Sequence, residues 1–162
     1  MNAFSIIIPT FNDELNIEKN VIHLIKKVKK IRINYEIIIV NDGSKDNTIK
    51  ILKRLRKKYK NIKILNNAHN LGKSFSVRKG LKLSKYKKIV LIDSDLPYLD
   101  SFEKIINRLN QNYDFVFVNR RHRKSVIKNE KLNFYQFSRY LIGFLVSFII
   151  KIILKFNTVE TD

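Results

Sequence analysis

In Ile89-Val90-Leu91-Ile92-Asp93-Ser94-Asp95, a fully apolar segment is followed directly by two acids. Four apolar residues in a row indicate a strand that is buried on both faces. Side chains at positions i and i+2 of an extended chain project to the same side, so Asp93 and Asp95 can face one ligand. A polar turn after a strand would explain the same acids, and the rest of the chain must separate the two interpretations.

The two carboxylates suggest a cation site. Two carboxylates held close together repel each other, which raises the pKa of one of them. A divalent cation removes this cost, and Mg²⁺ or Mn²⁺ accepts carboxylate oxygens together with phosphate oxygens of a substrate. Asp93 and Asp95 therefore predict a Mg²⁺ or Mn²⁺ site that binds a diphosphate.

Short apolar segments alternate with amphipathic segments along the first 118 residues. The apolar segments are typical of buried strands, and apolar residues at helical spacing follow each of the first four. This alternation predicts an α/β fold with a mostly parallel sheet flanked by helices. The expected strands cover residues 4–8, 37–40, 62–65, 89–92 and 115–118.

Polar residues and glycines mark the expected turns and helix starts. Asn12 or Asp13 is expected to cap the first helix, and Asp46 the second. The third helix is expected over about 72–84. Asp100 and Glu103 have the spacing of a capping box for the fourth helix.

The residues that follow the expected strands are nearly all polar. In a parallel sheet, ligands bind beyond the carboxyl ends of the strands. The residues expected there are Thr10-Phe11-Asn12, Asn41-Asp42-Gly43, 66–70, Asp93-Ser94-Asp95 and Asn119-Arg120. A purely structural sheet does not need this convergence of acids, amides and a base, so we interpret it as an active site.

Composition limits the classes of protein that fit. The 162 residues carry 33 Lys and Arg against 14 Asp and Glu, a net charge of +19. This excess has two interpretations, a polyanionic partner or coding bias, and the charge alone does not separate them. The lysines are not gathered with aromatic residues, so we expect no nucleic-acid partner.

Cys is absent, which excludes disulfides and thiolate metal sites. The first residues lack the pattern of a secretory signal, so we expect a cytoplasmic location.

The pattern changes after residue 119. A basic loop is expected over 120–131 and a long helix over about 132–155. Its uncharged run, residues 140–150, is too short for a bilayer, which needs about 20 apolar residues. Two interpretations are open: a helix that lies at a membrane interface, or a core helix that covers the sheet. A contact with a partner chain or a second copy through this helix is also compatible with the pattern.

Four motifs stand in the order found in family 2 glycosyltransferases, namely residues 5–14, 36–48, 70–73 and 93–95. Within this family the chain most resembles the dolichyl- or polyprenyl-phosphate mannose and glucose synthases, from about residue 4 to the last residue. The resemblance implies the GT-A fold of inverting, nucleotide-sugar-dependent enzymes. It also implies a single domain over 1–162, with a nucleotide-sugar-binding part at 1–119 and an acceptor side at 120–162.

The resemblance implies roles for individual residues. Asp93 and Asp95 would hold Mg²⁺ or Mn²⁺ and would be catalytic together with Asp162. Arg120 and Arg139 would bind an acceptor phosphate. The residues implied for binding the donor are Pro9, Phe11, Asn12, Glu14, Asp42, Lys73 and Asp93.

The chain departs from the family pattern at three points. Pro97 stands where the family often has a Gln that contacts the metal, and Phe134 stands where an acceptor-side Arg is expected. The family continues beyond an Asp near residue 162 with an Asp-x-x-x-Gly-Phe segment. We therefore expect a chain that is truncated at its C-terminus.

The implied function is transfer of a hexose from GDP-mannose or UDP-glucose to a polyprenyl or dolichyl phosphate at the cytosolic face of a membrane. Two alternatives stay open. The chain could belong to a family 2 transferase of surface polysaccharide or glycolipid synthesis, or it could be a donor-binding domain without activity of its own.

Overall fold

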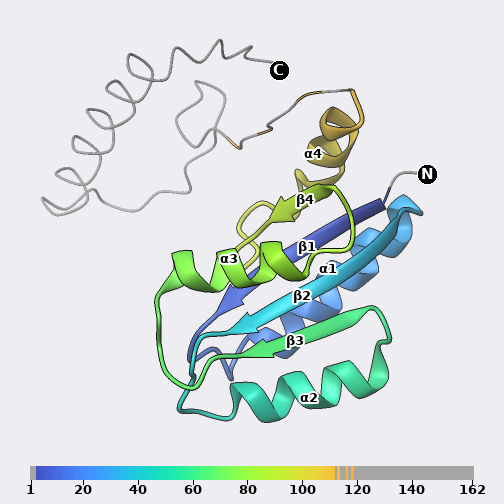
Figure 1. Ribbon diagram of the computed structural model, residues 1–162. Coiled ribbons are helices and arrows are strands. Elements are labelled where there is room, and N and C mark those ends of the chain that lie inside the picture. Colours follow the sequence, from blue (N-terminus) through green and yellow to red (C-terminus); the bar gives the residue numbers. More distant parts are fainter. Residues whose placement is uncertain (1–2, 112, 114–115, 117, 119–162) are drawn as a thin grey trace, which may run out of the picture. The chain divides into compact units, whose positions relative to one another are not determined.

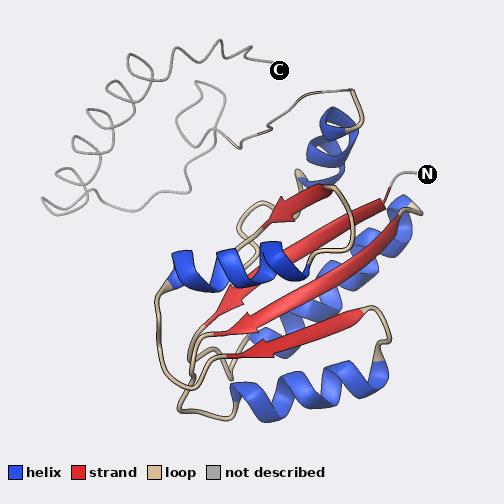
Figure 2. Ribbon diagram, in the orientation of Figure 1, coloured by secondary structure: helices blue, strands red, loops and turns tan. Residues whose placement is uncertain are grey.

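The computed structural model describes residues 3–111, 113, 116 and 118, and it shows parallel strands flanked by helices (Figure 1). The elements are β1 (Ala3–Thr10), α1 (Ile17–Ile31), β2 (Asn34–Asn41), α2 (Thr48–Lys58), β3 (Ile62–Asn66), α3 (Lys73–Leu83), β4 (Lys88–Leu91) and α4 (Phe102–Leu109). The strands form one sheet in the order β3-β2-β1-β4, visible as the red layer in Figure 2. The expected α/β class is confirmed.

Strands β1 and β2 are buried on both faces, which explains why their sequences are apolar without alternation. They pair in parallel with Ile6 opposite Ile37, and Ile7 opposite Ile38. All four side chains are fully buried. Neighbours in register project to the same face, so the first pair lies in the large core cluster and the second pair on the opposite face. Each face therefore needs its own covering helices.

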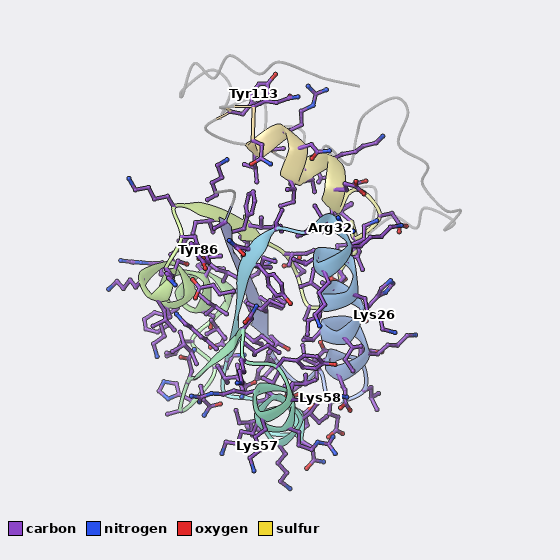
Figure 3. All side chains as sticks on the ribbon, turned by 90° about the vertical axis from the view of Figure 1, so that its right-hand side faces the viewer. Lys26, Arg32, Lys57, Lys58, Tyr86 and Tyr113 are labelled. Atoms are coloured by element: carbon purple, nitrogen blue, oxygen red, sulfur yellow. The ribbon has the colours of Figure 1, made fainter. Side chains whose placement is uncertain are left out.

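The helices cover the sheet in two layers. Helices α1 and α2 contact each other on one face, and α3 contacts β1 and β2 on the other (Figures 1 and 3). Helix α1 buries an apolar stripe at helical spacing and ends at Arg32, which has a left-handed φ of 57°. Helix α3 approaches the sheet closely at Gly80, where an added Cβ would lie 2.5 Å from Cγ2 of Ile7.

The helix starts differ in part from expectation. Helix α1 begins after Asn16 without a side-chain cap. The backbone N–H groups of residues 12–14 donate to side chains of the loop between β2 and α2 and to Thr48, the first residue of α2. The expected cap by Asn12 or Asp13 is therefore wrong. Helix α2 has Asn47 and not the expected Asp46 at its N-cap position. Oδ1 of Asp46 nevertheless accepts the N–H of Thr48, the first residue of α2, at 3.0 Å. Helix α4 follows Ser101 and has no side-chain cap, so the capping box of Asp100 and Glu103 is wrong.

Several expectations fall outside the described residues. The fifth strand was expected over 115–118, of which only residues 116 and 118 are described, and neither lies in a strand. The acceptor-side part at 120–162 with its apolar helix lies wholly outside, as do Arg120, Arg139 and Asp162. In the part of the chain that the structure describes, the helices are too short or too polar to cross a membrane.

The basic side chains are spread over the outer surfaces of separate helices, as the sequence indicated. Lys26 on α1 and Lys57 on α2 are exposed and point away from the sheet (Figure 3). One buried acid, Glu36 of β2, accepts the Ser5 hydroxyl at 2.6 Å and pairs with Lys63 at 2.7 Å. Glu36 also accepts the N–H of Lys85, so it joins β1, β3 and the start of the β4 segment.

Gly43 lets two loops at the carboxyl ends of the strands touch. Its φ is +70°, and an added Cβ would lie 2.3 Å from the backbone carbon of His69. Backbone atoms cannot move aside as the end of a side chain can, so only glycine fits there. Gly72 also has a positive φ, +89°, but an added Cβ there would meet no atom within 4 Å.

These two glycines give a matched pair of variants. Gly43→Ala should lower the free energy of unfolding by roughly 3 kcal/mol, from backbone overlap and an unfavourable φ together. Gly72→Ala should cost less, because only its backbone conformation is unfavourable. Chemical denaturation of both variants measures the difference. A larger loss in Gly72→Ala would show that the loop contact at Gly43 is not close.

Candidate functional site

A pocket of about 470 Å³ lies at the carboxyl ends of the strands. The loops after β1, β2, β3 and β4 all contribute to its walls. It brings together Asp93 and Asp95 with most of the residues that the resemblance implied for the donor. Its lining consists of Pro9, Thr10, Phe11, Asn12, Asp13, Asp42, Asn70, Gly72, Lys73, Asp93, Ser94 and Asp95.

The loop that carries the two acids is fixed at both sides. Ile92, directly after β4, donates its N–H to the carbonyl of Ile7 at 3.1 Å, so the pairing with β1 continues past the strand end. The carbonyl of Ser94 accepts the side-chain amide of Asn20 on α1 at 2.8 Å. The carboxylates of Asp93 and Asp95 are thus presented to the pocket by a short loop that is tied to both the sheet and α1.

Asp93 pairs with a lysine from the opposite wall of the pocket. Nζ of Lys73, the first residue of α3, lies 2.6 Å from Oδ1 of Asp93. The Asp93 side chain is 38% exposed and that of Lys73 is 61% exposed. Asp95 is exposed as well. The pair places a cation and two carboxylates within one open site.

Asp42 is buried at the base of the pocket, where its carboxylate organises the loop before α3. Its oxygens accept the N–H groups of Leu71 at 3.0 Å and of Gly72 at 2.8 Å, and the side-chain amide of Asn67 at 2.6 Å. Burial alone would raise the pKa of Asp42, but these hydrogen bonds outweigh it and hold the pKa below its usual value. Asp42 therefore holds the two residues that precede Lys73, the first residue of α3.

The loops after β1 and β2 form one hydrogen-bonded unit. Oδ1 of Asn12 accepts the N–H of Lys45 at 2.9 Å, and the N–H of Asn12 donates to the Ser44 hydroxyl at 2.8 Å. Oε2 of Glu14 accepts both the backbone N–H and the side-chain amide of Asn47. Asn12 still lines the pocket, but Glu14 lies outside its lining. The structure therefore does not bring Glu14 together with the other expected donor residues.

The resemblance gave no role to five of the lining residues: Thr10, Asp13, Asn70, Gly72 and Ser94. Thr10, Asn70 and Ser94 were already expected at the carboxyl ends of the strands, and all five residues lie within the four sequence motifs. Thr10 and Asp13 share a further property. The Thr10 hydroxyl and one Asp13 carboxylate oxygen are buried without a hydrogen-bond partner among the described residues. Such groups destabilise the free protein.

The acids of the pocket fit a cation that is shared with a ligand. The described residues contain no cluster of three or more His, Cys, Asp or Glu that could hold a metal by themselves. Mg²⁺ and related ions are commonly held by one or two carboxylates, with substrate phosphates and water completing the shell. Asp93 and Asp95 supply oxygens of this kind in a pocket with room for a diphosphate.

A comparison with models of protein families matches residues 5–158 to the family described as Glycosyl transferase family 2. The chain belongs to this family. The expected class of enzyme, a glycosyltransferase, is thereby confirmed.

Individual relatives of this family 2 glycosyltransferase agree with the family model. An uncharacterized glycosyltransferase of Synechocystis is 36% identical, over 74% of this chain and 38% of its own length. A dolichyl-phosphate beta-glucosyltransferase of Dictyostelium discoideum is 35% identical, over 56% of this chain and 30% of its own length. The matches thus span about a third of the length of these two curated relatives.

Solved structures of glycosyltransferases share the fold. The mannosyltransferase PcManGT from Pyrobaculum calidifontis, in complex with GDP-Man and Mn²⁺, has a TM-score of 0.55 at 19% identity, over 65% of this chain and 32% of its own. S. aureus TarS residues 1–349, in complex with UDP-GlcNAc, has a TM-score of 0.51 at 27% identity, over 65% of this chain and 31% of its own. The expected GT-A-like fold is confirmed.

Asp42 makes the stability of this family 2 chain depend on pH. The pKa values of Glu36, Asp42 and Asp46 are all held below their usual values by hydrogen bonds that outweigh burial. A carboxyl with a lowered folded-state pKa stabilises the fold fully above its unfolded pKa, about 4, and loses this contribution as the pH falls through the folded value. We expect the free energy of unfolding to fall steeply below pH 4.

The variant Asp42→Asn tests this assignment. It should lose about 1–3 kcal/mol at pH 7, because an amide nitrogen then faces backbone N–H donors. It should also lose less further stability than the wild type between pH 4 and pH 2, since one titrating group is gone. Denaturant titrations across this range give both quantities. Parallel curves for the two proteins would show that Asp42 is not a source of the acid sensitivity.

Proposed function

We propose that this chain binds a nucleotide-sugar together with Mg²⁺ or Mn²⁺ and forms the donor side of an inverting hexosyltransferase. The observation that carries the proposal is the pocket in which Asp93 and Asp95 face Phe11, Asp42 and Lys73 at the carboxyl ends of the strands. Two structural neighbours, one in complex with GDP-Man and Mn²⁺ and one in complex with UDP-GlcNAc, support this choice of ligand.

The nucleoside end of the donor would lie at the β1 and β2 side of the pocket. Phe11 is 43% exposed there and offers an apolar ring to a base or ribose, next to Pro9 and Asn12. Asp42 lines the same region, although its oxygens already accept three groups of the chain. We assign Asp42 mainly to holding the loop and Phe11 to contact with the nucleoside.

The diphosphate end would lie between β4 and α3. Asp93 and Asp95 would hold the cation, which when bound neutralises the negative charge of the departing nucleoside diphosphate. Lys73 lies within the same region and can bind phosphate oxygens as a point charge. Chemistry of this kind needs no nucleophilic side chain, because the acceptor itself attacks the sugar.

For the acceptor we propose a polyprenyl or dolichyl phosphate, which would be reached from the cytosolic face of a membrane. The dolichyl-phosphate glucosyltransferase among the relatives supports this choice. A phosphate acceptor is already an anion, so it needs little help from a general base. Arg120 and Arg139 would bind its phosphate, and Asp162 would complete the catalytic acids. These three assignments rest on the family resemblance alone.

The proposal predicts metal-dependent donor binding that requires Asp95. In calorimetry, either UDP-glucose or GDP-mannose should bind the wild type, and Mn²⁺ should strengthen this binding. Asp95→Asn should lower donor affinity in Mn²⁺ by at least about tenfold, the size of loss that follows damage to a metal shell. Donor affinity without Mn²⁺ should change little.

Asp100→Asn is the matched control, because Asp100 is an exposed acid of the same loop that does not line the pocket. It should bind the donor as the wild type does. If a folded wild-type chain binds neither nucleotide-sugar with or without Mn²⁺, the proposed function is wrong. A screen of lipid phosphates against polysaccharide and glycolipid acceptors, with donor fixed, then separates the proposed acceptor from the alternative.

A further inference from the structure

The ion pair between Lys73 and Asp93 involves a carboxylate that the proposed donor site also uses. Nζ of Lys73 lies 2.6 Å from Oδ1 of Asp93, inside the pocket. A divalent cation held by the same carboxylate would lie near this ammonium group, and the two positive charges would repel each other. The two cations therefore compete for Asp93.

We propose that Lys73 is the counter-cation of Asp93 while the donor site is empty, and that it keeps Mg²⁺ or Mn²⁺ out until a nucleotide-sugar arrives. The diphosphate then attracts the ammonium group of Lys73 and leaves Asp93 free for the divalent cation. This inference rests on the proposed function and adds an order of binding to it.

The surroundings of Lys73 suit a side chain that changes partners. Its backbone is held, because the two preceding N–H groups, those of Leu71 and Gly72, bond to the buried Asp42. Its side chain is 61% exposed, and a lysine head on a flexible stem can move without disturbing the helix. The backbone of Lys73 is thus held in place, while its ammonium group can change partners.

The acids near Lys73 do not form a site that would bind a metal ion without the donor. Asp42 is committed to the chain's own N–H and amide groups. Asp13 also lines the pocket and has a buried carboxylate oxygen without a hydrogen-bond partner among the described residues, but these residues contain no cluster of three or more acids that could hold a metal. Asp93 and Asp95 alone are fewer ligands than a hard cation needs, and Asp93 is paired with Lys73. Because coupling between two ligands is reciprocal, a diphosphate that removes Lys73 should raise cation affinity, and the cation should raise diphosphate affinity equally.

The test measures Mn²⁺ binding in the absence of any donor, with the EPR signal of free aqueous Mn²⁺ as the readout. Lys73→Met should bind Mn²⁺ about tenfold more tightly than the wild type, because both the exposed ion pair and the repulsion between the two cations are lost. Lys73→Arg keeps the positive charge and should bind Mn²⁺ as weakly as the wild type. Circular dichroism confirms that each variant is folded.

Lys82→Met is the matched control for net charge. Lys82 is an exposed lysine of the same helix that does not line the pocket, so its loss should change Mn²⁺ affinity less than about twofold. Equal Mn²⁺ affinity in Lys73→Met and the wild type, or an equal gain in both Met variants, would overturn the inference.

The same proteins separate this inference from the function on which it rests. Adding inorganic diphosphate should tighten Mn²⁺ binding to the wild type several-fold more than to Lys73→Met, because only the wild type has a lysine to displace. If the wild type binds a nucleotide-sugar with Mn²⁺ but Lys73→Met shows no change in Mn²⁺ affinity, only the inference fails. If the wild type binds no nucleotide-sugar under any condition, the proposed function fails.

Discussion

The central position of β1 in the sheet is the constraint on which the rest of the structure depends. β1 pairs in parallel with β2 on one side and β4 on the other, so the register of one strand sets the position of three loops. Ile7 is opposite Leu91, and continuation of that register brings Asp93 beside Pro9. On the other side Thr10 is opposite Asn41, which brings Asp42 to the same level. The pocket forms where these loops meet.

The apolar segments could be predicted because a strand that is buried on both faces is apolar at nearly every position. A strand such as 37–40 has no solvent-facing side on which polar residues could alternate, and the prediction differed from β2 only at its ends. The motif residues at the carboxyl ends were found for a related reason. Parallel strands all point their ends to one edge, so the order of the chain predicts which side chains gather there.

The details of the loops could not be predicted, since they depend on contacts between distant residues. The family resemblance gave Glu14 a role in donor binding. In the structure, its carboxylate instead accepts two N–H groups from Asn47, 33 positions away. The expected cap of α1 by Asn12 was wrong for the same reason, because the side-chain oxygen of Asn12 accepts the N–H of Lys45 instead of an N–H of the helix. The Lys73–Asp93 pair likewise joins two motifs that the sequence presents as separate, and no local pattern marks it.

The hydrogen bonds between the loops after β1 and β2 determine where this site can change during evolution or engineering. Thr10 is buried, and Asn12 bonds to both Ser44 and Lys45, so the backbone on each side of Phe11 is held in place. Phe11 itself presents an exposed ring to the pocket. Under the proposed function, libraries aimed at a new sugar nucleotide should therefore vary this single position and leave its neighbours unaltered, because exchange of an exposed ring disturbs fewer contacts of the chain than displacement of the loop.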